Sequence, residues 1–119
     1  MKNGLTIDSD GNRRWYLNGR CHRTDGPAYE WAGGHKAWYL HGELHRTDGP
    51  AVEYADGSKE WYVHGELHRT DGPAYEWADG HKVWCLNGKR YETINAYLEA
   101  LEASNEEKMK LKLIWGSYA

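Results

Sequence analysis

Hydrophobic and polar positions alternate in short runs along most of the chain, and no helical spacing of hydrophobic residues occurs before residue 90. Runs such as "AYEW" and "KAWYL" are rich in residues that favour strands. Pairs that end in glycine separate the runs, as at Asn18-Gly19 and Asp56-Gly57. Such pairs suit two-residue type I′ hairpins, because both central residues then adopt positive φ. The pattern predicts an antiparallel meander of short strands.

The same pattern recurs with a period of 23 residues. The units 42–64 and 65–87 are identical at 16 of 23 positions, and the segment 4–18 aligns with the second half of a unit. We therefore expect a mainly β protein, built as an antiparallel β-hairpin repeat meander. Residues 1–88 would hold the repeats, which are a half repeat, 4–18, and three whole repeats, 19–41, 42–64 and 65–87.

The chain after the repeats has a different pattern. Thr93 is placed to cap a helix over about residues 94–103, where hydrophobic residues take helical spacing. Residues 105–115 fit either a second helix or a strand. We expect residues 89–119 to form a C-terminal helical cap within the same domain, because a repeat stack needs a different terminal unit. An alternative is that this segment, or a sheet face, joins the chain to a partner or to a second copy.

Aromatic residues supply most of the hydrophobic content, with seven Trp, nine Tyr and no Phe. A two-residue turn at Gly33-Gly34, which is equivalent to the Asp-Gly pairs, places Tyr29 opposite Trp38, and one at His41-Gly42 places Trp38 opposite His45. This register gathers aromatic residues on one sheet face and points Arg46 and Arg69 to the opposite face. A single sheet with one cap leaves part of its aromatic surface open, which marks a partner site, although the same residues also suit a core. The expected binding face comprises Trp38, Trp61, Trp84, Tyr29, Tyr75, His45 and His68.

The phrase "HRTDGP" occurs once in each whole repeat. Its Thr, Asp, Gly and Pro are turn or bulge residues, so its first interpretation is the bend between one repeat and the next. A second hypothesis is an exposed polar ladder that binds an anionic ligand. The residues of that ladder are Arg23, Arg46, Arg69, Asp25, Asp48 and Asp71.

Catalytic and metal sites are not expected. His22, His45 and His68 recur with the repeat, which separates neighbours by about 10 Å, twice the strand spacing. One zinc ion, with ligands about 2 Å away, cannot use two of them. No Ser or Cys nucleophile recurs beside the histidines, so the sequence predicts no enzyme activity, no metal and no cofactor.

Charge and hydropathy narrow the class of partner. The net charge is −3 and the basic residues are scattered among acids, which makes nucleic acid an unlikely partner. No signal peptide is recognisable, and no apolar run approaches the roughly 20 residues of a membrane span. We expect a cytoplasmic protein without membrane contact.

The repeat resembles the MORN repeat (membrane occupation and recognition nexus), in the divergent variant of phage and bacterial proteins. Over about residues 4–88, Gly42 and Gly65 match the turn glycine of the motif, and His45 and His68 match its histidine. Arg46 stands where the family motif has glycine. The resemblance implies an elongated curved sheet and a scaffolding or binding role.

The hypothesis that follows is a non-enzymatic binding protein. The resemblance favours a phage-type inhibitor that binds a host protein, such as a defence enzyme, in the host cytoplasm. The alternative is a small-ligand binder, for example a nucleotide sponge that uses Arg and Trp. A hydrolase is a third, weaker alternative.

Overall fold

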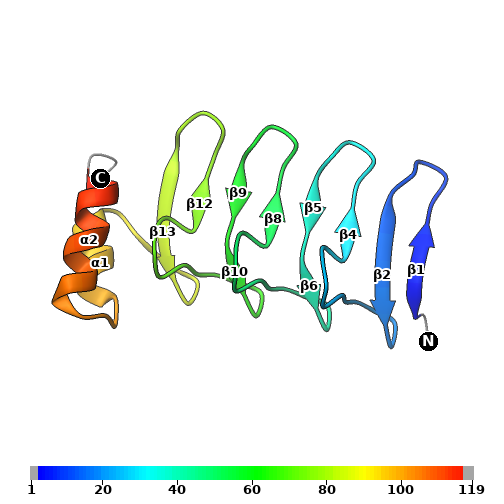
Figure 1. Ribbon diagram of the computed structural model, residues 1–119, viewed down its shortest axis with the longest axis horizontal. Helices are drawn as coiled ribbons and strands as arrows, with labels where there is room; N and C mark the ends of the chain where they lie inside the picture. Colours follow the sequence, from blue (N-terminus) through cyan, green and yellow to red (C-terminus); the bar gives the residue numbers. More distant parts are fainter. Residues whose placement is uncertain (1–2, 117–119) are drawn as a thin grey trace.

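A computed structural model describes residues 3–116. The molecule is elongated, with extents of 48 × 28 × 20 Å. Its strands follow one another along the long axis in sequence order, and two helices stand at the C-terminal end (Figure 1). The fold is mainly β with a helical cap, as the sequence predicted.

Each whole repeat contains an upper hairpin, and a lower hairpin joins it to the chain that follows; the upper turns lie at the top of Figure 1 and the lower turns at the bottom. The strands are β1 (Gly4–Ile7), β2 (Arg13–Leu17), β3 (Arg20–Cys21), β4 (Tyr29–Glu30), β5 (Lys36–Ala37), β6 (Tyr39–Leu40), β7 (Glu43–Leu44), β8 (Val52–Glu53), β9 (Lys59–Glu60), β10 (Tyr62–Val63), β11 (Glu66–Leu67), β12 (Tyr75–Glu76), β13 (Lys82–Leu86) and β14 (Lys89–Tyr91). The main sheet runs in the order β1-β2-β4-β5-β8-β9-β12-β13-β14, with β3 paired to β2. The hairpins β6-β7 and β10-β11 form separate two-stranded sheets. All these pairs are antiparallel, so the meander is confirmed.

The lower turns are the two-residue type that the sequence predicted. Asn18, His41, His64 and Asn87 all have positive φ, between 49° and 52°, and a positive-φ glycine follows each of them. The register around the second of these turns pairs Tyr39 with Leu44, as a two-residue turn requires.

The upper turns are one residue longer than predicted. In the repeat 42–64, the N–H of Tyr54 donates to the oxygen of Ser58 at 2.9 Å, and the N–H of Gly57 donates to the oxygen of Tyr54 at 3.0 Å. Only the glycine has positive φ, which is the three-residue turn with a glycine bulge. Tyr29 consequently lies opposite Ala37 rather than Trp38. The predicted register is wrong by one residue, and a one-residue slip moves side chains to the other face.

The observed register gives the sheet two distinct faces. The Trp face carries the four tryptophans that precede the lower hairpins, which are Trp15, Trp38, Trp61 and Trp84. The opposite face, here named the open face, carries the cross-strand row of Arg14, Tyr29, Ala37, Val52, Glu60, Tyr75 and Val83.

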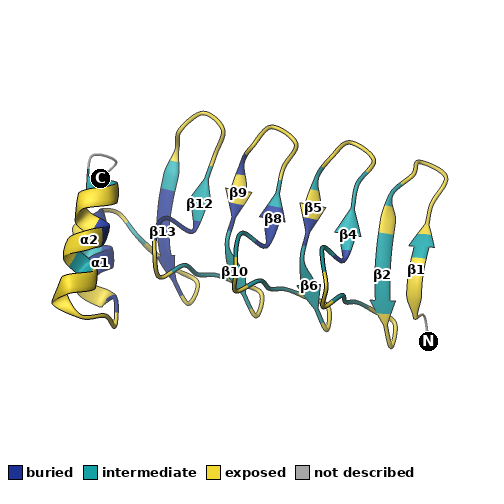
Figure 2. Ribbon diagram, viewed as in Figure 1, coloured by how far each residue is buried: buried dark blue, intermediate teal, exposed yellow. Residues whose placement is uncertain are grey.

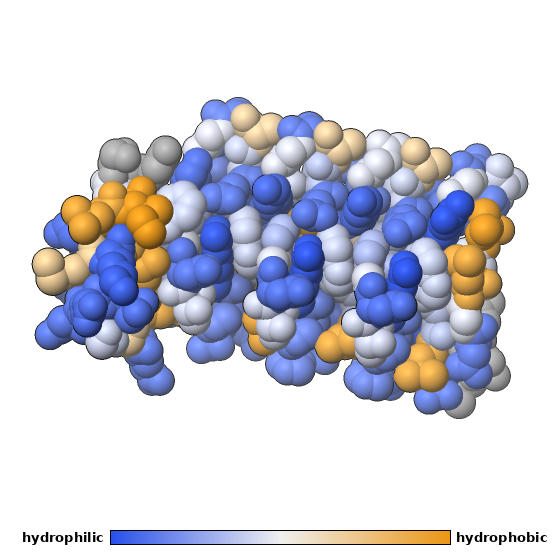
Figure 3. Space-filling view, viewed as in Figure 1, coloured by the Kyte–Doolittle hydropathy of each residue, from blue (hydrophilic) through white to orange (hydrophobic). Residues whose placement is uncertain are grey.

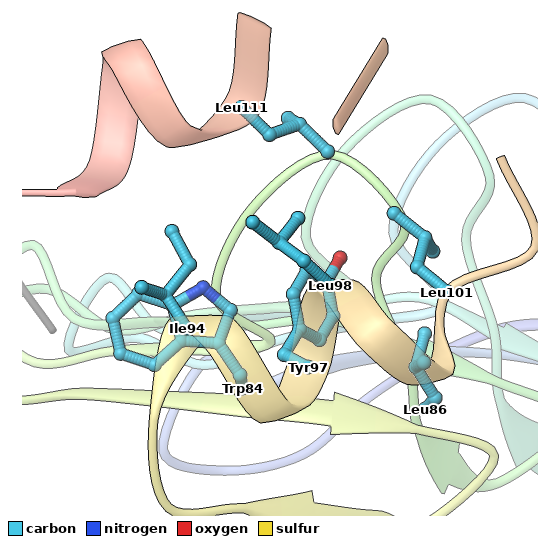
Figure 4. Packing of buried hydrophobic residues seen from close by; sticks show 7 residues of the cluster. All are labelled: Trp84, Leu86, Ile94, Tyr97, Leu98, Leu101 and Leu111. Carbon is cyan, nitrogen blue, oxygen red and sulfur yellow. The ribbon is translucent and has the colours of Figure 1, made fainter. Parts of the chain in front are cut away.

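The helical cap packs on the Trp face of the last repeat. Helix α1 (Ile94–Ala100) begins after its N-cap Thr93, and helix α2 (Asn105–Trp115) begins after Ser104, whose hydroxyl accepts from the N–H of Glu107. The open question about 105–115 is thus resolved in favour of a helix. The cap and β13 enclose the main hydrophobic cluster, formed by Trp84, Leu86, Ile94, Tyr97, Leu98, Leu101 and Leu111 (Figure 4).

Burial is uneven along the sheet. It is greatest at β13 and the inner side of α1, and β1 at the other end is mainly exposed (Figure 2). Hydrophobic side chains reach the surface over the helices and near the N-terminal strands (Figure 3). On α2, Met109 is 67% exposed and Leu113 85% exposed. The cap therefore completes a core and also presents an apolar helix side.

Candidate functional site

On the Trp face, the arginine of each "HRTDGP" phrase stacks on the tryptophan eight residues before it. The guanidinium carbon of Arg46 lies 3.8 Å from the ring centre of Trp38, and that of Arg69 lies 3.9 Å from Trp61. The first repeat has the same contact between Arg23 and Trp15, at 3.9 Å. The prediction that the arginines face away from the tryptophans is wrong, because it extended the lower hairpin beyond His45, whereas the N–H of Arg46 donates to the oxygen of Tyr62 in the next lower hairpin.

Other contacts of each guanidinium lie within its own repeat. Nε of Arg46 donates to Oδ1 of Asp48 at 2.9 Å, and Nη1 donates to the oxygen of Pro50 at 3.0 Å. Glu53 completes the set with an ion pair at 4.0 Å. The equivalent bonds of Arg23 and Arg69 involve Asp25 and Asp71. The arginines and aspartates of the proposed polar ladder therefore make their contacts within the fold. This supports the interpretation of the phrase as a structural bend rather than as a site for an anionic ligand.

Two equivalent grooves lie between successive phrases on the Trp face. The first, of about 540 Å³, lies between the phrases of the first and second repeats above Trp38 and His45. The second, of about 510 Å³, has Trp61 and His68 at the same positions. Their walls are threonines, aspartates and already paired arginines. An anion in either groove would have to compete with the Asp–Arg pairs.

The recurring histidines connect one repeat to the next. Nδ1 of His22 accepts from the N–H of His41 at 2.9 Å, and Nδ1 of His45 accepts from the N–H of His64 at 3.0 Å. Nδ1 of His68 accepts in the same way. An accepting nitrogen carries no proton, so each ring is neutral in this arrangement. Two of the residues predicted to bind a partner, His45 and His68, thus hold the lower turns together.

Because these histidines accept hydrogen bonds in the folded protein, we expect its free energy of unfolding to depend on pH. Burial, followed by the neighbouring histidine, lowers the pKa of His22 and of His45 below the ordinary 6.5. The unfolded chain then binds more protons than the folded chain below about pH 6.5. Stability is expected to be complete above that pH and to fall as the pH drops through the folded-state pKa values.

Melting temperatures between pH 8 and pH 5 would measure this effect. The matched variant carries His22→Asn and His45→Asn, because Oδ1 of Asn12 already accepts from the N–H of Ala32 at 2.8 Å in the upper turns. Asparagine keeps an acceptor and removes the titration, so the variant should show a flatter profile. An equally steep fall in the variant would contradict this role.

The open face presents aromatic rings along its length. Tyr29 and Trp31 stack with ring centres 3.6 Å apart, and His35 stands edge-on to Tyr54 at 5.4 Å. In the next repeat the run continues through Tyr75, Trp77 and His81. Tyr54 is 37% exposed and Trp77 is 43% exposed. The accessible aromatic surface therefore lies on this face.

A pocket of about 400 Å³ lies on the open face between the third and fourth upper hairpins. Its lining consists of Tyr54, Asp56, Ser58, Glu60, Tyr75, Trp77, Ala78 and Asp79. Glu60 is only 5% exposed, although it is charged. The hydroxyls of Tyr54 and Tyr62 each donate to one of its carboxylate oxygens at 3.0 Å. These bonds fix the carboxylate at the pocket wall.

Glu60 also affects the tyrosines around it. Burial, and then the charge of Glu60, raises the pKa of Tyr54 to about 12. Burial, and then a hydrogen bond to Glu60, raises the pKa of Tyr75 to about 12. Both hydroxyls therefore remain protonated donors at neutral pH, and the pocket offers no base or nucleophile from its tyrosines.

The binding residues predicted from the sequence are divided between the two faces. Trp38 and Trp61 lie half-buried under arginines, and Trp84, 3% exposed, belongs to the core under the cap. Tyr29 and Tyr75 lie on the open face. The prediction of one face shared by all these residues is wrong. It also omitted Glu60, which departs from Arg14, Ala37 and Val83 at the same place in the other units, a signal visible in the sequence.

Other kinds of site find little support in the described residues. Within residues 3–116, no group of three or more His, Cys, Asp or Glu side chains could hold a metal ion. Burial raises the pKa of the thiols of Cys21 and Cys85, which disfavours the nucleophilic thiolate. In the described part of the chain, the helices are too short or too polar to cross a membrane.

Comparison with known proteins does not place the chain in a family. No protein-family model matches it, and no curated protein matches it.

Proposed function

We propose that this protein is a non-enzymatic binding protein that holds a protein partner on its open face. The observation that carries the proposal is the run of partly exposed aromatic rings on that face, with Trp77 as its most exposed tryptophan at 43%. Trp, Tyr and Arg dominate the energetics of protein interfaces, because they bury large areas and make directed contacts. The run extends over successive repeats, which suits a broad protein surface better than a single small molecule.

The Trp face is a weaker candidate for the same role. Trp38 and Trp61 stack on arginines of the following repeat, and the cap covers the last repeat of this face. A partner on this face would have to break the Asp–Arg pairs or displace the cap. The open face requires no such rearrangement, and this difference supports it as the docking surface.

A host enzyme remains the partner class that the MORN-like resemblance favours. On that basis we propose that the protein acts as an inhibitor that occupies a surface of a host defence protein in the cytoplasm. The elongated sheet suits this role, because it can cover a surface without itself supplying catalytic groups.

Substitution on the open face tests the proposal. Immobilised protein should retain a stoichiometric partner from a bacterial lysate, and Trp31→Ala combined with Trp77→Ala should remove that partner. Trp77 is exposed and Trp31 is partly exposed, and neither belongs to the buried clusters, so the fold should survive. The matched control is Leu113→Ala on α2, which removes another exposed hydrophobic residue, 85% exposed, away from the open face.

Two results would contradict the proposal. Retention of the partner by the double tryptophan variant would exclude the open face, and loss of the partner with Leu113→Ala alone would place the site on the cap. Co-purification of a nucleotide, seen as absorbance near 260 nm without a protein partner, would favour the small-ligand alternative instead.

A further inference from the structure

We propose that the pocket between Tyr54, Tyr75 and Trp77 receives an arginine side chain of the partner. This inference rests on the proposed function, because it assigns the chemistry of one contact on the open face. The arginine would place its guanidinium against the aromatic rings and donate hydrogen bonds to the carboxylates of the pocket.

The charge of the pocket selects a cation. Three of its eight lining residues are acids, Asp56, Glu60 and Asp79, and none of the eight is Lys, Arg or His. The carboxylate of Glu60 accepts hydrogen bonds from neutral tyrosine hydroxyls. These bonds occupy part of its acceptor capacity, and its negative charge remains. A buried carboxylate attracts a cation more strongly than an exposed one, because less water screens it.

The walls of the pocket suit a flat cation. The rings of Tyr75 and Trp77 stand nearly perpendicular, at 76° with centres 4.9 Å apart, and so form a corner. A guanidinium in that corner can lie over one ring face while its N–H groups point along its own plane toward the acids. The volume, about 400 Å³, is ample for one arginine side chain.

The chain uses the same recognition chemistry within its own fold. Arg46 lies over Trp38 at 3.8 Å and bonds Asp48 at 2.9 Å, so an indole and a carboxylate together hold one guanidinium. The pocket offers this pair of groups again, with Trp77 and the acids, and its lining supplies no guanidinium. An arginine from outside would complete the arrangement.

The repeat itself indicates that the pocket is a specific feature. The positions equivalent to Glu60 hold Arg14, Ala37 and Val83, so a strand of this type is formed without an acid. Burying a charge is costly unless the charge is both hydrogen-bonded and paired, and Glu60 is hydrogen-bonded while the pocket lining holds no cation to pair with it. The acid also occurs in only one of the units, which would provide one arginine site in each molecule.

Titration of the whole chain with a small probe tests the pocket directly. The probe is N-acetyl-arginine amide, and its control is N-acetyl-citrulline amide, which has nearly the same shape without the charge. In ¹⁵N-correlated NMR spectra, the indole N–H of Trp77 and the amides around Tyr54 and Tyr75 should shift saturably with the arginine probe. The citrulline probe should shift them weakly or not at all.

Two variants then identify the groups responsible. Glu60→Gln keeps the size of the side chain and removes its charge, and should weaken the arginine probe by about tenfold or more. Because Glu60 is buried, that variant could lose its fold, which the dispersion of the same spectra would reveal. Trp77→Ala changes an exposed residue and should weaken the probe without loss of fold. Equal binding of both probes, or unchanged affinity in a folded Glu60→Gln and in Trp77→Ala, would overturn the inference.

The outcomes separate this inference from the proposed function. Partner binding that depends on Trp31 and Trp77, without saturable arginine binding, would overturn the arginine pocket and leave the docking face in place. Saturable arginine binding in a protein whose partner is unaffected by the tryptophan variants would support the pocket and overturn the docking face.

Discussion

Replacing Trp61 with alanine is expected to lower the free energy of unfolding by about 3–5 kcal/mol. Trp61 packs against the buried cluster of Ala74, Val83 and Cys85, and its ring lies 3.9 Å beneath the guanidinium of Arg69. The substitution would leave a cavity and also remove the surface on which a half-buried charge rests. Native proteins are stable by only about 5–15 kcal/mol, so a domain this thin could lose most of its folded population.

Trp77 provides the matched control. Alanine at that position removes the same kind of side chain from the open face, and should cost about 1 kcal/mol or less. Urea denaturation followed by far-ultraviolet circular dichroism would measure both variants. Equal losses of stability would mean that Trp61 and Trp77 contribute equally to the free energy of unfolding. The assignment of the open face to binding would then fail.

The period and the lower turns of this fold could be predicted from its sequence. Asn18-Gly19 and Asn87-Gly88 occupy the same position of the 23-residue period, and asparagine tolerates positive φ. Histidine takes the same conformation at positions 41 and 64, where the alignment of the repeats identified the turn. Repetition made these turns recognisable, because each unit supplied independent evidence for the same feature.

The upper turns could not be assigned in the same way. Asp-Gly suits a two-residue turn, and it suits equally the three-residue turn in which only the glycine has positive φ. The longer turn also forms at Gly33-Gly34, which has no aspartate side chain, and there the N–H of Trp31 donates to the oxygen of His35 at 2.9 Å. One residue of turn length then decided the faces of Tyr29 and Trp38, and with them the composition of the predicted site.

The "HRTDGP" phrase has a second role that could not be predicted from the sequence. Its turn character is local and was recognisable from the sequence, but its arginine acts on a tryptophan eight residues earlier, across a hairpin. Glu60 shows the opposite case. It could have been found, because it departs from the residues at the equivalent positions 14, 37 and 83.

The glycine of the phrase leads to the second large expected effect, which is loss of stability in Gly49→Ala. A Cβ at this position would lie 2.9 Å from the guanidinium carbon of Arg46 and 3.2 Å from its Nε. Gly49 does not have positive φ, so alanine fits the backbone, and the three atoms nearest to its Cβ all belong to Arg46. That arginine is held by Asp48 and by the ring of Trp38. Displacing it should cost about 1–3 kcal/mol.

Two controls separate this collision from a general effect of removing glycine. Gly33→Ala should be neutral or slightly stabilising, since Gly33 also lacks positive φ and nothing lies within 4 Å of its added Cβ. In a background that already carries Arg46→Ala, Gly49→Ala should lose most of its cost, because the group it displaces is absent. Unfolding free energies of the unaltered protein, the two single variants and the double variant would decide the matter. An undiminished cost without Arg46 would show that the glycine is required by the backbone, and that the guanidinium does not set the packing of the phrase.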